Sequence, residues 1–150
     1  MLAGLLLVYW TVFAGLVDAW STDDNYSHGF FIVPLAAFFA WERREAFAAA
    51  PVRASLFGWV IAAGSLALLT AGLLGAELFL SRVSIVGAAA GSLLVLFGWP
   101  RLRVMLFPLA FLLLMVPLPA LIFNKIAFPL QLLASEVGEH SISAMNIPIL

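Results

Sequence analysis

The residues best suited to chemistry lie in one short polar stretch near the N-terminus. It reads Asp23-Asp24-Asn25-Tyr26-Ser27-His28-Gly29 and brings carboxylates, a hydroxyl and an imidazole together. An imidazole titrates near neutral pH, so His28 could act as a general acid or base, oriented by Asp24. Because the side chains of adjacent residues rarely face one another, Ser27 beside His28 does not predict a hydrolase.

A structural role explains the same stretch and is favoured by the residues alone. Ser27 or Asn25 would cap the free N–H groups of a helix that begins near Gly29. The two carboxylates would interact favourably with the positive, N-terminal end of the helix dipole. His28 and His140 are the only histidines and show no ligand spacing, so neither a metal site nor a cofactor is expected.

Composition limits the possible classes of protein. The chain has 150 residues, of which 65% are hydrophobic and 10% charged, whereas globular domains carry roughly 25% charged residues. Too few charges remain to coat a surface in water, so we expect an all-α, polytopic transmembrane bundle forming a single domain over residues 1–150. The net charge of −1 gives no reason to expect nucleic acid as a partner.

The apolar segments predict about five transmembrane spans. A bilayer core of about 30 Å requires roughly 20 apolar residues per helix. Pro34 falls near the first turn of the second span, where a missing N–H matters least. The predicted spans cover residues 2–19, 29–41, 56–75, 83–99 and 104–117.

Basic residues predict the orientation of these spans. Arg43 and Arg44 lie in the connection 42–55, and Arg101 and Arg103 in the connection 100–103. Both connections are expected in the cytoplasm, together with the N-terminus, whereas the loop 20–28 is expected outside. The Arg43–Arg44 pair would also contact anionic membrane lipids.

Other residues are expected at the membrane surface. Glu77 and Arg82 lie beside the short link between the third and fourth spans and should stay near the lipid headgroups. The tryptophans near span ends are typical of an aromatic belt. These are Trp20, Trp41, Trp59 and Trp99.

Small residues in the fourth span predict a helix interface. Gly87 and Gly91 are separated by three alanines, and Ser84 lies one turn earlier. Such a face allows two helices to approach closely. We favour packing within this protein over a dimer interface.

The stretch from Leu121 onwards differs from the earlier spans. Asn124, Gln131, Ser135 and Glu139 share one face of a helix by their spacing. The pattern is compatible with an interfacial helix on the outer leaflet or with a sixth span packed against other helices.

Two motifs give the chain a resemblance to a known family. The stretch 24–34, followed by Trp41-Glu-Arg-Arg44, resembles the exosortase/archaeosortase family. So does Val116-Pro-Leu-Pro119 followed by Phe128-Pro-Leu-Gln-Leu-Leu-Ala-Ser135 and then 146–150. The resemblance implies a cysteine protease and transpeptidase in the bacterial inner membrane. Its expected partners are exported proteins with a C-terminal sorting signal, which consists of a Pro-Glu-Pro motif, a transmembrane helix and a basic tail.

The chain departs from that family in one decisive respect, because it contains no cysteine. No catalytic residue is therefore assigned, and we expect an N-terminal portion that ends before the nucleophile and is inactive alone. A non-catalytic scaffold or accessory subunit of envelope or exopolysaccharide assembly is the alternative, and a transporter fragment is a further one. The matched signature positions, whose role the resemblance leaves open, are Asp24, Tyr26, Ser27, His28, Gly29 and Pro34.

Overall fold

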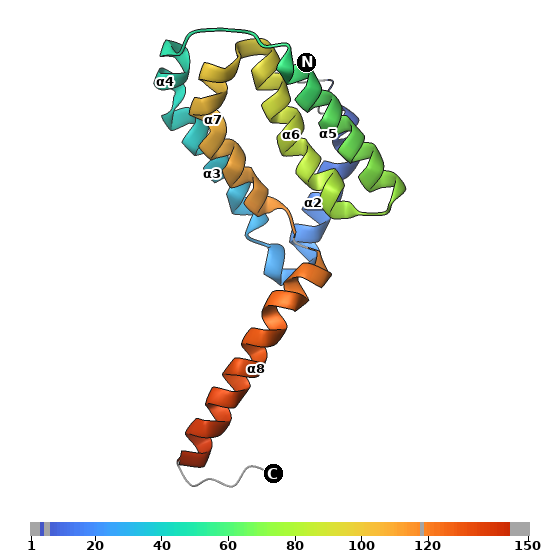
Figure 1. Ribbon diagram of the computed structural model, residues 1–150, viewed down its shortest axis with the longest axis vertical. Coiled ribbons are helices and arrows are strands. Elements are labelled where there is room, and N and C mark those ends of the chain that lie inside the picture. The colour runs from blue at the N-terminus through green and yellow to red at the C-terminus, as the bar shows by residue number, and fades with distance from the viewer. Residues whose placement is uncertain (1–3, 5–6, 118, 145–150) are drawn as a thin grey trace. The chain divides into compact units, whose positions relative to one another are not determined.

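The computed structural model describes residue 4, residues 7–117 and residues 119–144. These residues form helices joined by turns and short loops, with no strand among them, which confirms the all-helical prediction (Figure 1). The chain divides into two compact units, Met1–Pro117 and Leu118–Leu150. Parts of the first predicted span and the segment 146–150 lie outside the described residues.

The first unit contains six α-helices and two short 3-10 helices within its described residues. The fourth predicted span begins earlier than expected, at Leu78, because the link from α5 is only three residues long. The elements in order are α2 (Trp10–Thr22), η1 (Asp24–Tyr26), α3 (Gly29–Glu42), α4 (Arg44–Ala49), α5 (Phe57–Leu74), α6 (Leu78–Phe97), α7 (Trp99–Leu112) and η2 (Leu113–Met115).

Two helices in the described part of the chain, α5 and α6, are long and apolar enough to cross a membrane. The helices α3 and α7 have 14 residues each. At 1.5 Å per residue each covers about 21 Å, which is less than the roughly 30 Å of a bilayer core. The count of about five spans therefore stays a prediction.

Helices α5 and α6 form an antiparallel pair in which small residues bring the backbones together (Figure 1). A Cβ atom at Gly91 would lie 2.8 Å from the backbone nitrogen of Ala62, and one at Gly58 would lie 2.5 Å from that of Val95. Larger side chains at these positions would push the helices apart.

The two connections that carry most of the arginines meet at one end of this unit. The Arg53 N–H donates to the Phe97 carbonyl at 3.1 Å, and the Arg101 Nε donates to the Ala50 carbonyl at 3.0 Å. Gly98 ends α6 with a φ of +81° and packs directly against the Arg53 backbone. Both the positive φ and the close approach require glycine there.

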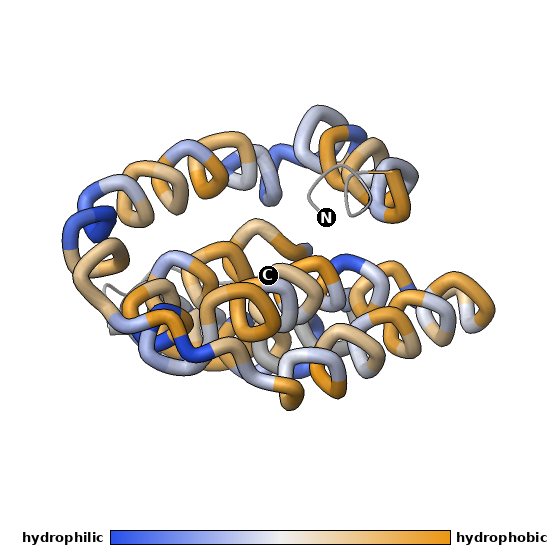
Figure 2. The backbone as a smooth tube through the Cα atoms, turned by 90° about the horizontal axis from the view of Figure 1, so that it is seen from above, coloured by the Kyte–Doolittle hydropathy of each residue, from blue (hydrophilic) through white to orange (hydrophobic). Residues whose placement is uncertain are grey.

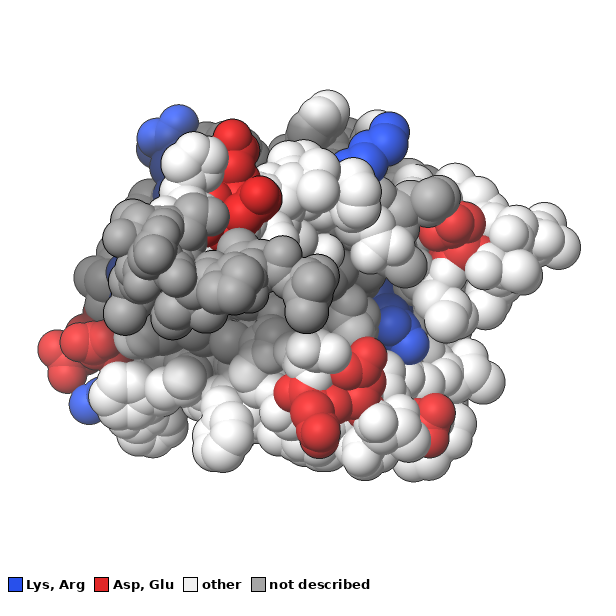
Figure 3. Space-filling model, turned by 90° about the horizontal axis from the view of Figure 1, so that it is seen from below, with Lys and Arg blue, Asp and Glu red and all other residues white. Residues whose placement is uncertain are grey.

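The surface of the described chain is largely apolar. Figure 2 shows hydrophobic colours along most of the tube, and the charged side chains in Figure 3 form only a few small groups. On α5, Leu66, Leu73 and Leu74 have 45%, 57% and 89% of their surface exposed. Contiguous exposed apolar surface of this kind is suited to lipid rather than water.

The second unit contains the helix α8 (Ala120–Ala144), which continues through Pro129. The side chains of Asn124, Gln131, Ser135 and Glu139 are all exposed. Exposed Phe128 and Leu132 interrupt this polar face, which suits the membrane interface or a contact with further helices, so both predicted interpretations of this segment stay open.

Candidate functional site around Trp20

Trp20 joins three segments at the end of the first unit opposite the basic connections. Its side chain is 7% exposed, and its indole Nε1–H donates to the Met115 carbonyl at 3.0 Å. The ring also makes an edge-on contact with Phe30, with centroids 5.3 Å apart. The C-terminal turn of α2 is thereby tied to the start of α3 and to η2.

The aromatic-belt prediction is wrong for Trp20, which lies inside the protein. The tryptophans Trp41 and Trp59 are 66% and 59% exposed, as a position facing lipid or headgroups requires. Spacing alone did not separate these cases, because a tryptophan at a span end can point outward or inward with the same sequence neighbours.

Gly29 lies directly against the Trp20 indole. A Cβ atom at this position would overlap the ring, and the residue is buried. Gly29 is the first residue of α3, where the backbone conformation itself does not require glycine. Glycine is needed here because of the close approach to the indole. This contact is a physical reason for the glycine in the Tyr-Ser-His-Gly stretch.

The polar residues before Gly29 form a local turn. The Asp23 carboxylate accepts hydrogen bonds from the Asn25 backbone N–H at 3.0 Å and from its side-chain amide at 2.9 Å. The Ser27 hydroxyl donates to the Asp24 carbonyl at 2.9 Å. Asp23 therefore caps η1, and the prediction that Ser27 or Asn25 caps the following helix is wrong.

His28 precedes α3 and bonds to its first turn through the backbone carbonyl rather than through the side chain. Its carbonyl accepts from the N–H groups of Phe31 and Ile32, whereas its exposed imidazole makes no capping bond. Across the described residues, no hydrogen bond or ion pair joins Asp24 to His28. The structure thus brings the two residues into one turn without pairing them.

Tyr26 and Arg82 connect this turn to α6. Tyr26 packs against the buried cluster around Trp20 and lies near the Arg82 guanidinium. Arg82 is only 8% exposed, and its Nη2 donates to the Gly15 carbonyl at 3.0 Å. Because α6 begins at Leu78, Arg82 packs against α2 within the protein, and its expected position near the lipid headgroups stays a prediction.

The predicted packing residues of α6 face two different neighbours. Gly87 lies against Ser65 of α5, and Gly91 lies against the α5 backbone at Ala62. Ser84 is fully buried, and its carbonyl accepts a hydrogen bond from the Tyr9 hydroxyl at 3.3 Å. Ser84 thus belongs to the contact with the segment that leads into α2.

Pro34 lies away from these contacts. It is exposed in the second turn of α3, close to the first turn, as the sequence pattern predicted. There it provides no N–H for the Phe30 carbonyl.

The arginines at the opposite end are held by aromatic rings. Arg43 lies over Phe107 at 4.8 Å and also donates to the Val104 carbonyl at 3.4 Å. The other pairs are Arg44 with Trp41, Arg101 with Phe47 and Phe97, and Arg103 with Trp99. Cation–π contacts of this kind orient guanidinium groups at a surface.

The described residues around Trp20 form an ordered polar turn packed against the helices of the first unit. Among them no group of three His, Asp or Glu side chains is arranged to hold a metal ion. The Trp20 contacts hold the polar turn against α6 and η2, and this geometry can present a loop beside a bundle of apolar helices.

These features define a helical membrane protein with an ordered polar turn at one end of its bundle. Residues 20–150 match the family model described as transmembrane exosortase. The chain therefore belongs to the transmembrane exosortase family, as its motifs predicted. The match begins at Trp20, and comparisons with curated proteins and with solved structures gave no match.

Proposed function

We propose that these residues form the N-terminal, membrane-embedded part of an exosortase that processes exported proteins. The substrates would carry a C-terminal sorting signal with a Pro-Glu-Pro motif, a transmembrane helix and a basic tail. The observation that carries the proposal is the family match over residues 20–150. The ordered turn around Trp20 supports it, since it gives the signature glycine a structural reason.

The reaction would be acyl transfer through a cysteine thiolate. The thiolate attacks the peptide carbonyl and forms a thioester as the amine leaves, and a second nucleophile then takes over the acyl group. The sequence has no cysteine, so the proposal places the thiolate outside these 150 residues. The role of this chain is to position substrate and neighbouring helices near the polar turn.

The orientation belongs to the same proposal. The basic end, with Arg43, Arg44, Arg101 and Arg103, would face the cytoplasm, and the turn 20–28 would face outward across the bacterial inner membrane. Both basic connections meet at one end of the first unit, which supports a common side for them. The N-terminus would then be cytoplasmic.

Reading the gene past codon 150 is the first test. An in-frame segment with a cysteine supports the enzyme, whereas a stop codon directly after Leu150 overturns it for this protein. In the first case, cells expressing the full reading frame should cleave a reporter carrying the sorting signal, and a cysteine-to-alanine variant should not. The 150-residue chain alone should give no turnover in the same assay.

A non-catalytic accessory role is the second candidate, favoured by the absence of cysteine. Such a subunit would bind partner proteins of envelope assembly without cleaving them. A stop codon after Leu150 together with an intact reporter would favour this role over the enzyme.

A further inference from the structure

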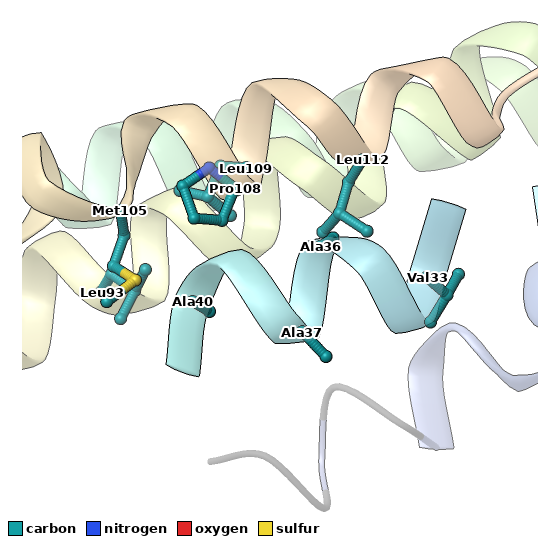
Figure 4. A pocket seen from close by; sticks show the side chains of 9 residues that line it. All are labelled: Val33, Ala36, Ala37, Ala40, Leu93, Met105, Pro108, Leu109 and Leu112. Atoms are coloured by element: carbon teal, nitrogen blue, oxygen red, sulfur yellow. The ribbon is translucent and has the colours of Figure 1, made fainter. Parts of the chain in front are cut away.

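A groove on the side of the first unit is separate from the Trp20 site. It lies between α3 and α7, has a volume of about 300 Å³ and is lined only by apolar side chains. Figure 4 shows Ala36, Ala37 and Ala40 along one wall and Met105 and Pro108 along the other. The small alanine side chains leave the groove open.

One end of the groove is next to an arginine. Ala36 and Ala40 line the groove from one face of α3, and Arg43, the residue that caps the C-terminus of α3, follows them at the same helical spacing. Arg43 is half-buried, and it contacts Val104 and Phe107 of α7, the helix that forms the opposite wall of the groove. An apolar channel that ends at a cation is complementary to a molecule with an acyl chain beside an anion.

Arg43 has capacity to bind such an anion. Within the described chain no carboxylate pairs with it, whereas the neighbouring Arg44 pairs with Glu45 at 3.6 Å. A guanidinium has five N–H donors, and Arg43 uses one in a long contact of 3.4 Å with Val104. Guanidinium groups bind phosphate through several charge-assisted hydrogen bonds.

We infer that the groove holds an acyl chain of an anionic phospholipid whose phosphate is bound by Arg43. The basic end attracts anionic headgroups, because five arginines in the two connections outnumber Glu42 and Glu45. A cavity of this volume is at the lower limit of small-ligand pockets, about 300 Å³.

Photolabelling of the wild-type chain tests the location. The chain is placed in nanodiscs of phosphatidylglycerol and phosphatidylcholine, with a trace of phosphatidylglycerol that carries a diazirine on one acyl chain. Labelled peptides should come from the groove, at Ala37 and Met105, in excess over α5. Equal labelling at the exposed residues Leu66 and Leu73 would show only bulk lipid and overturn the inference.

Two variants test the binding chemistry by native mass spectrometry of the chain extracted from membranes. Arg43→Gln should reduce retained phosphatidylglycerol by about tenfold, which is the effect of losing one hydrogen bond to a charged group. Ala40→Phe should abolish the retention by filling the groove. Arg103→Gln and Ala63→Phe, which change the same residue types at exposed positions that do not line the groove, should retain it. Unchanged retention in both groove variants would contradict the inference.

A protein occupant would give a different result. With benzoylphenylalanine in place of Ala37, ultraviolet light in cells should produce a lipid adduct of the chain. A cross-link to another protein in place of that adduct would show that a partner fills the groove. Neither result depends on the proposed peptidase function, because all three measurements follow lipid rather than cleavage.

Discussion

At the scale of single residues, the contact between Trp20 and Gly29 organises the candidate site. The indole fills the space that a side chain at residue 29 would occupy and donates a hydrogen bond to Met115. A buried tryptophan N–H needs a hydrogen-bond partner to offset the loss of water, and the Met115 carbonyl provides one. The polar turn therefore depends on a buried aromatic residue that carries no chemistry itself.

Gly29→Leu should destabilise the first unit by about 1–3 kcal/mol, because the new side chain must displace the Trp20 ring. The free energy of unfolding in detergent micelles, followed by tryptophan fluorescence, measures this change. Gly15→Leu is the matched control, since nothing lies within 4 Å of a Cβ atom there. Equal losses in both variants would show that the Trp20 contact is not responsible.

At the scale of helices, small residues determine how closely α5 and α6 approach. The two helices meet backbone to backbone at Gly58 and Gly91, whereas at Gly87 the nearest atom is the Ser65 hydroxyl oxygen. A backbone neighbour cannot move away, but a side-chain neighbour can be removed by mutation. The interface therefore contains one position where a clash can be created and then relieved.

Gly87→Ala should destabilise the helix pair by about 1–3 kcal/mol, because its Cβ would lie 2.5 Å from the Ser65 Oγ. Adding Ser65→Ala should restore most of the loss, since the next nearest atom, the Ser65 Cβ, is 3.5 Å away. The free energies of unfolding of the two single variants and the double variant measure this coupling.

Gly64 is the control position for this experiment, because a Cβ atom there would meet no other atom. Gly64→Ala lies on α5 with nothing within 4 Å, so it should be neutral or slightly stabilising through helix propensity. Additive effects of Gly87→Ala and Ser65→Ala, with no recovery in the double variant, would contradict the proposed contact.

At the scale of the first unit, the polar turn and the basic connections occupy opposite ends. The arginines at one end contact aromatic rings and the backbone of the neighbouring connection. The turn 20–28 packs against α6 and η2 at the other end. An asymmetric distribution of arginine is the pattern that orients membrane proteins.

Single cysteines test this orientation, since the chain contains none of its own. Ser27→Cys should react with a membrane-impermeant maleimide added to intact spheroplasts, whereas Ala48→Cys should react only after permeabilisation. Both positions are exposed, so accessibility within the protein does not limit either reaction. The opposite labelling pattern would reverse the proposed orientation.

Several properties were determined by the sequence alone. Hydrophobic composition and segment length predicted a helical membrane protein, because these features reflect the solvent around each segment rather than its partners. The motifs around His28 and Pro119 identified the family, because a short local sequence pattern can be recognised without knowing the tertiary contacts. The α3 and α5 boundaries agree with the predicted spans to within a residue or so.

Only the tertiary structure decided which side chains face inward. Trp20 and Arg82 both lie near the ends of predicted spans, and their side chains are buried because α2 packs against α6 and η2. The capping residue of the polar turn and the groove beside Arg43 likewise depend on neighbours that are distant in sequence or on local backbone geometry. Periodicity indicates that a helix has an apolar face, but contacts between helices determine which neighbour that face meets.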